Sequence, residues 1–152
     1  MKKMFIAVWV VLLLMVLVAA ACTKEGIAGT HEMPEPKHFQ VTSLDGKQIG
    51  SIIMEAMPDG AARINVTMQP SSIEGLPAVE PLLTRSGNSS TQEVFAELEQ
   101  ITPTDPVSEN RPVVANNGIV LSYDALEKTR VLTLRLEVAG TDQAISEVRL
   151  QQ

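Results

Sequence analysis

Apolar and polar residues alternate along two segments of the chain. Residues 62–68 place an apolar side chain at every even position and a polar one at every odd position. Residues 129–139 do the same from Leu132 to Val138, with Leu134 at the centre. Because successive side chains of a strand point to opposite faces, both segments predict strands with one face on a core.

Turn residues separate these strands from other short apolar runs. Each turn has the residue types of a tight hairpin connection, since glycine adopts positive φ and proline presets φ. The expected strands are 39–43, 47–57, 62–68, 113–115, 119–121, 129–139 and 144–150, and the turns between them include Asp45-Gly46, Pro58-Asp59-Gly60, Asn116-Asn117-Gly118 and Gly140-Thr141-Asp142. About seven short strands at this spacing predict a mainly β protein, an Ig-like β-sandwich.

The middle of the chain has a different pattern. Residues 69–81 and 102–112 contain three prolines each and predict loops. Between them, Ser90-Thr91-Gln92-Glu93 has the spacing of a capping box. Apolar residues then follow at helical spacing up to Ile101, at Val94, Phe95, Leu98 and Ile101. This pattern predicts one short helix of about ten residues.

The first 21 residues have the composition of a secretory signal. Lys2 and Lys3 precede an uncharged apolar run over 5–21 that ends in small residues. The run is close to the minimum length of a membrane span, so an uncleaved anchor is the competing interpretation. The segment Val18-Ala19-Ala20-Ala21-Cys22 resembles the lipobox of bacterial lipoproteins, although that family prefers Leu at the position that Ala19 occupies. The resemblance implies cleavage before Cys22 and acylation of its thiol.

The lipoprotein prediction divides the chain into three parts. Residues 1–21 are expected to be a lipoprotein signal peptide, 22–38 a lipidated cysteine with a flexible tether, and 39–152 the β-sandwich domain. Two or three acyl chains, such as palmitate, would hold the protein stably on a bilayer. By the same resemblance, Thr23 lacks the aspartate that retains lipoproteins at the inner membrane. We therefore expect a bacterial envelope location, at the outer membrane and facing the periplasm.

Charge and aromatic content exclude some classes of partner. Lys2 and Lys3 are the only charged residues in 1–21, so residues 22–152 contain ten basic and eighteen acidic residues. Phe39, Phe95 and Tyr123 are the aromatic residues of that part. A chain with this negative balance and few stacking platforms is not expected to bind nucleic acid. The sequence also contains no recognised catalytic or cofactor motif, so we expect neither an enzyme nor a cofactor.

One group of side chains has the chemistry of a copper ligand set. His31, Met33 and His38 supply imidazole and thioether groups, which suit copper. Three further methionines, Met54, Met57 and Met68, fall on or near the first hairpin. The alternative is that Met54 and Met68 occupy core positions and that both histidines belong to the tether or its border. A periplasmic metal or small-ligand carrier is the second hypothesis for function.

Residues 41–54, VTSLDGKQIGSIIM, resemble the opening hairpin of bacterial copper–zinc superoxide dismutases. The resemblance implies a strand, an Asp-Gly turn and a second strand at the start of a sandwich. That family then supplies a His-x-His pair of metal ligands, and this chain has no histidine after His38. The resemblance therefore implies the topology without the metal site. The first hypothesis is a lipid-anchored, non-catalytic interaction or structural module that binds an envelope protein through an exposed edge or through the loops 69–81 and 102–112.

Overall fold

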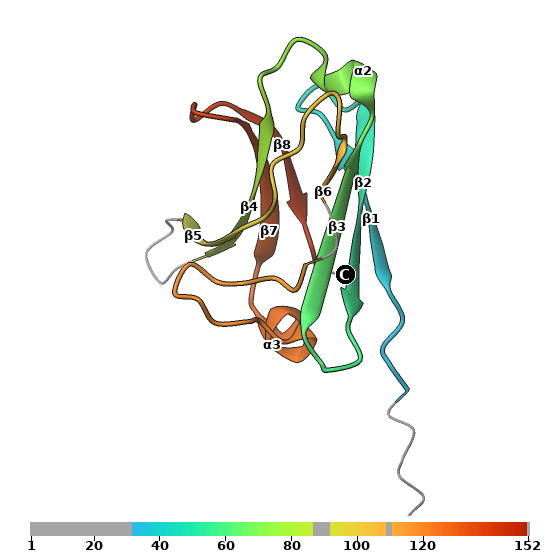
Figure 1. The fold of residues 1–152 in the computed structure, drawn as a ribbon, viewed down its shortest axis with the longest axis vertical. Helices are drawn as coiled ribbons and strands as arrows, with labels where there is room; N and C mark the ends of the chain where they lie inside the picture. Colours follow the sequence, from blue (N-terminus) through green and yellow to red (C-terminus); the bar gives the residue numbers. More distant parts are fainter. Residues whose placement is uncertain (1–31, 87–91, 109–110, 152) are drawn as a thin grey trace, which may run out of the picture. The chain divides into compact units, whose positions relative to one another are not determined.

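A computed structural model describes residues 32–86, 92–108 and 111–151, and residues 33–152 form one compact unit (Figure 1). The unit is a β-sandwich of two four-stranded antiparallel sheets, as the alternating pattern predicted. One sheet has the order β1-β2-β3-β6, from strands Lys37–Thr42, Gln48–Ala56, Ala62–Met68 and Val107–Ser108. The other has the order β5-β4-β7-β8, from strands Gln92–Glu97, Val79–Ser86, Leu132–Val138 and Ala144–Arg149.

The first two hairpins follow the turn residues of the sequence. β1 pairs with β2, and β2 pairs with β3, both antiparallel. Gly46 and Gly60 have φ of +86° and +82°, values that favour glycine because it lacks a Cβ. The hairpin predicted from the resemblance to dismutases is therefore confirmed. β1 begins at Lys37, two residues before the predicted domain boundary.

The two alternating segments form opposite walls of the core. On β3 the apolar side chains are almost completely buried, and on β7 the same holds for Leu132, Leu134 and Leu136. The polar face of β7 is more covered than the alternation suggests, since Thr133 and Glu137 are also buried. β7 is a central strand, and Arg135 contacts Glu137 across this face with Nε–Oε1 at 2.7 Å. Long neighbouring side chains thus shield the outer face of β7.

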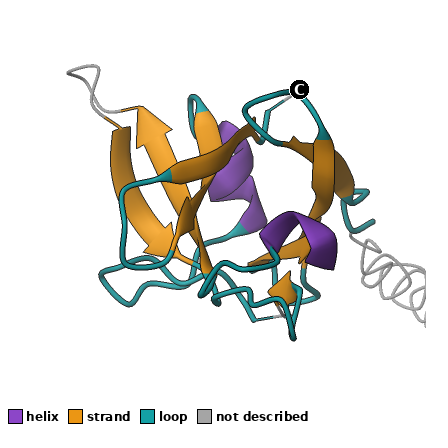
Figure 2. Cartoon of the chain, turned by 90° about the horizontal axis from the view of Figure 1, so that it is seen from above, coloured by secondary structure: helices purple, strands orange, loops and turns teal. Residues whose placement is uncertain are grey.

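The chain crosses between the sheets three times, from β3 to β4, from β5 to β6 and from β6 to β7. β6 returns to lie beside β3, and β7 returns to lie beside β4. This is the Greek-key arrangement of β-sandwiches. Figure 2, which views the domain from above, shows the two sheets as facing layers.

The helix predicted between Thr91 and Ile101 is wrong. Residues Gln92–Glu97 form β5 instead, which pairs antiparallel with β4 from Leu82↔Glu97 to Ser86↔Gln92, and residues 98–101 are not helical either. A helix of about ten residues is only marginally stable by itself, because its few backbone hydrogen bonds barely offset the entropy cost of forming the first turn. Pairing with β4 buries Ala96 completely, so tertiary contact decides the conformation here.

The described helices lie elsewhere in the chain. α2 is a single turn at Pro70–Ile73, within a segment predicted to be a loop. α3 spans Tyr123–Lys128, where no element was predicted, and the Ser122 side chain accepts a hydrogen bond from the Ala125 amide at 3.2 Å. Tyr123 and Leu126 anchor α3 in the core. Neither helix is long and apolar enough to cross a membrane, and this holds for all helices in the described ranges.

Gly50 in β2 is required by close approach of the backbone. A Cβ added at this position would overlap the carbonyl oxygen of Thr67 and crowd the Met68 side chain. We expect Gly50→Ala to lower the free energy of unfolding by about 1–3 kcal/mol, because the β2–β3 ladder must shift to admit it. Denaturant melts would measure this. The exposed neighbour Ser51, changed to Ala, should cost less than about 0.5 kcal/mol, and equal costs would contradict the steric argument.

Candidate functional site

The segment 111–122 closes the side of the sandwich between β3 and β5. The Val113 amide donates to the Ala62 carbonyl at 2.9 Å, so this part of the segment extends the first sheet. Further on, the Asn116 amide donates to the Phe95 carbonyl at 2.8 Å, which ties the segment to the edge strand of the second sheet. Two clefts lie along this segment.

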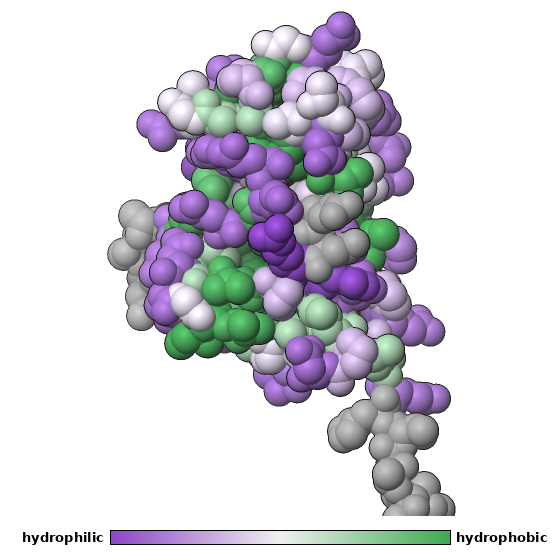
Figure 3. All heavy atoms as spheres, viewed as in Figure 1, coloured by the Kyte–Doolittle hydropathy of each residue, from purple (hydrophilic) through white to green (hydrophobic). Residues whose placement is uncertain are grey.

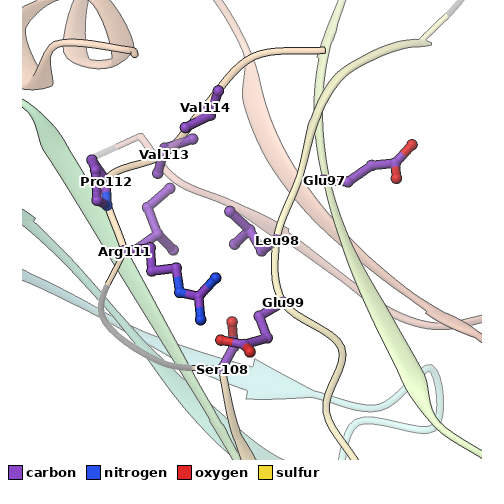
Figure 4. Close-up of a pocket in the computed structure, with 9 residues that line it drawn as sticks. Glu97, Leu98, Glu99, Ser108, Arg111, Pro112, Val113 and Val114 are labelled. Carbon is purple, nitrogen blue, oxygen red and sulfur yellow. The ribbon is translucent and has the colours of Figure 1, made fainter. Parts of the chain in front are cut away.

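The first, called the Arg111 cleft, has a volume of about 420 Å³ and is shown in Figure 4. Its apolar lining includes Ile64 and Val113, which are almost fully buried in the core. Figure 4 shows the Arg111 side chain extending into the cleft toward Glu99 and Ser108. The complete lining is Ile64, Glu97, Leu98, Glu99, Ser108, Arg111, Pro112, Val113 and Val114.

Pro81 explains why the chain leaves the β4–β5 ladder at Leu98 and Glu99, two residues that line this cleft. The Pro81 carbonyl accepts a hydrogen bond from the Leu98 amide at 2.9 Å. The backbone of Pro81 therefore points toward the edge strand β5 and the residues that follow it. The N–H and C=O of a strand residue point to the same side, and proline has no N–H. β4 therefore offers no donor to the chain there. The β4–β5 ladder ends at Glu97, and pairing resumes only at Val79↔Ile101.

The Arg111 cleft carries charge of both signs, and Figure 4 shows the Glu97 side chain pointing away from it. Two carboxylates, of Glu97 and Glu99, accompany one guanidinium, of Arg111, and all three side chains belong to exposed residues. Such a cleft suits an apolar group accompanied by a positive charge, because carboxylates attract cations and the apolar lining gains by losing water.

The second, called the Phe95 cleft, has a volume of about 260 Å³. Arg85 lies over the Phe95 ring, with its guanidinium carbon 5.5 Å from the ring centre, and pairs with Glu93 at 3.0 Å. The lining is Arg85, Glu93, Val94, Phe95, Ala115, Asn116, Asn117, Ile119 and Leu121. These contacts hold one wall of the cleft in place.

Four exposed apolar side chains lie at or near the Phe95 cleft: two of them, Val94 and Ile119, line it, and Val114 and Val120 pair with each other beside it. We call them the tether-end patch, which consists of Val94, Val114, Ile119 and Val120, with 38, 42, 59 and 51 % of their surfaces exposed. Figure 3 shows apolar residues gathered at the lower left, over β5 and the segment 111–122. A contiguous apolar patch on a protein surface commonly marks a site of contact with a partner or a membrane.

Comparisons with known proteins place this chain in no group: no family model, curated protein or solved structure matches it.

The described residues of the proposed copper ligand set do not point toward a common site. Met33 is 58 % exposed ahead of β1, and His38 lies on the exposed face of β1. In the β1–β2 register His38 is opposite Ile53, whereas Met54 is opposite Lys37 and fully buried, so His38 and Met54 point to opposite faces. Met68 is also in the core, as its strand position predicted. Cys22 and His31 lie outside the described residues.

No group of three His, Cys, Asp or Glu side chains is placed to hold a metal ion within the described ranges.

A polar cluster ties the start of β1 to α3. Lys37 Nζ donates to Glu127 Oε1 at 2.8 Å, and this hydrogen bond raises the pKa of Lys37. The pair therefore contributes stability below the ordinary pKa of 10.5, which is lost as pH rises through the higher folded value. Burial raises the pKa of Tyr123 above 10.0, so its phenol stays protonated near neutral pH. The cluster fixes the point where the chain enters the domain.

Some residues of these clefts could be predicted from the sequence. The loop 102–112 was expected to be a contact surface, and its Arg111 and Pro112 line the Arg111 cleft. Glu97 and Glu99 were visible as carboxylates but were placed on a helix. Only the pairing of β5 with β4 brings Glu99 opposite Arg111, and Glu97 points away from it (Figure 4). The exposed Ile119 and Val120 were expected to belong to a hairpin strand, and the alternation there was too short to reveal their exposure.

Proposed function

We propose that this protein is a lipid-anchored protein of the bacterial envelope that acts as a non-catalytic interaction module. The anchor would be acylated Cys22, and the lipobox-like segment 18–22 supports it. Thr23 supports attachment to the outer membrane, with the domain in the periplasm. Residues between Cys22 and Lys37 would span up to about 50 Å when extended and about 20 Å as a coil, enough to hold the sandwich near the bilayer.

The observation that carries the interaction role is the Arg111 cleft. It is an open hollow with an apolar floor and a charged rim, and its shape is held by the β-sandwich beneath it. Binding surfaces typically combine a buried apolar centre with polar groups at the edge. The partner that we propose is an envelope protein segment that presents an apolar side chain next to a lysine or arginine, because the Glu99 carboxylate at the rim would attract a cation beside the apolar floor.

A photo-crosslinking side chain at position 114 of the full-length protein, in intact cells, would test this proposal. Val114 lines the cleft and is 42 % exposed, so the label should not disturb the fold. We expect a defined crosslinked protein from position 114 and none from position 44, which is 75 % exposed on the β1–β2 turn. Binding of the purified partner should weaken about tenfold with Glu99→Lys, equivalent to about 1.4 kcal/mol.

Glu74→Lys supplies the matched control, since it makes the same charge change at an exposed site after α2. It should leave the affinity nearly unchanged at physiological salt, where distant exposed charges are screened. Equal crosslinking from positions 114 and 44, or equal losses in the two charge variants, would contradict a specific role for the Arg111 cleft.

A further inference from the structure

The tether-end patch lies at the end of the sandwich where the chain enters the domain. β1 starts at this end, where Lys37 pairs with Glu127 of α3. The segment 111–122 runs directly into α3, and Tyr123 donates its amide hydrogen to the Gly60 carbonyl in the β2–β3 turn. In Figure 1 this is the lower end of the domain, and in Figure 3 the patch occupies the same lower part.

Charge is distributed unevenly along the strands. At the tether end basic and acidic residues nearly balance: Lys37, Arg63, Arg85, Lys128, Arg130 and Arg149 against Glu32, Glu35, Glu55, Asp59, Glu93, Asp124 and Glu127. The far end is acidic, with Asp45, Glu74, Glu80, Asp105, Glu137 and Asp142 against Lys47. An anionic lipid surface would therefore repel the far end much more strongly than the tether end.

We propose that the tether-end patch docks on the surface of the membrane that holds the lipid anchor, with Ile119 and Val120 entering the boundary between headgroups and acyl chains. This inference rests on the proposed anchoring through Cys22. The patch would be too small to hold a free domain on a bilayer. If residues 23–37 act as the proposed tether, they would raise the effective concentration of the surface to the millimolar range, so a weak contact would suffice.

Docking would also orient the other binding surface. The Arg111 cleft lies beside the patch along the segment 111–122, and Val114 borders both. With the tether end on the bilayer, the acidic far end would point away from the membrane, and the Arg111 cleft would open to the side.

A unique label on the mature, full-length protein would test the docking. Acylation blocks Cys22, the only cysteine of the chain, so Ile119→Cys introduces one free thiol for a polarity-sensitive fluorophore. The labelled protein is placed in vesicles of phosphatidylethanolamine and phosphatidylglycerol that contain lipids brominated in the upper acyl chain. We expect several-fold stronger bromine quenching at position 119 than at position 44, labelled through Leu44→Cys. Val120→Cys should behave like Ile119→Cys.

Flotation of the same samples separates the two proposals. If the protein does not float with the vesicles, the lipid anchor fails, and the proposed function fails with it. If it floats but positions 119 and 44 are quenched equally, the docking proposal is overturned. A blue shift of the fluorescence at position 119 without bromine quenching would also overturn it. If that shift depended on protein concentration, the patch would be assigned to contact with a second copy of the chain. If it occurred only in native envelopes, the patch would be assigned to contact with another protein.

Discussion

Replacement of Leu134 by Ala is expected to lower the free energy of unfolding by about 2–5 kcal/mol. Leu134 is fully buried in the central strand β7, where it lies opposite Leu83 of β4 and Val148 of β8. Removing its side chain loses transfer free energy and leaves a cavity that rigid sheets on both sides cannot fill. Denaturant unfolding of wild type and variant, with unchanged m-values, would measure the difference.

Leu44→Ala provides the matched control, because it makes the same chemical change at a side chain that is 75 % exposed. Its expected cost is below about 0.5 kcal/mol. Thr133 is a poorer control than the alternation suggested, since it is buried and its carbonyl accepts a hydrogen bond from Thr84. Similar losses from Leu134→Ala and Leu44→Ala would contradict the placement of β7 at the centre of the core.

Replacement of Cys22 by Ala is expected to abolish lipidation and to leave an uncleaved precursor without lipid. The alanine variant has no thiol to accept an acyl group, so labelled palmitate should not be incorporated. Residues 1–21 should also stay attached, because the lipoprotein pathway cleaves only after acylation. Each buried methylene contributes about 0.8 kcal/mol, so the variant lacks the acyl chains that would hold the mature wild-type protein on the bilayer. Metabolic labelling and intact mass would report both effects.

Thr23→Ala is the control for this experiment, since it changes the adjacent residue and keeps the thiol. It should be acylated and cleaved as in the wild type. Normal cleavage of the Cys22→Ala variant would contradict the lipoprotein prediction and indicate an ordinary secretory signal. Retention of the full-length apolar segment in both wild type and variant would instead favour an uncleaved membrane anchor.

The parts of the fold that the sequence determined by itself are local. Asp45-Gly46 and Pro58-Asp59-Gly60 set two hairpins because they supply the dihedral angles that tight turns need. The alternation in 62–68 and 132–138 set two core strands, because a one-residue shift would expose every apolar side chain. These features depend on neighbouring residues alone, so a single sequence contains them in full.

Tertiary structure decided the rest, because the deciding contacts join residues far apart in the chain. Pro81 argued for a loop, yet β4 is a central strand whose interrupted ladder is tolerated because the proline faces an edge. The apolar spacing of 94–101 predicted a helix, but residues 94–97 belong to β5 because they pair with β4. The Arg111 cleft arises only from that pairing together with the closure by segment 111–122. Its Glu99 and Arg111 face one another because two segments far apart in the chain position them, one after β5 and one after β6, which no local pattern could specify.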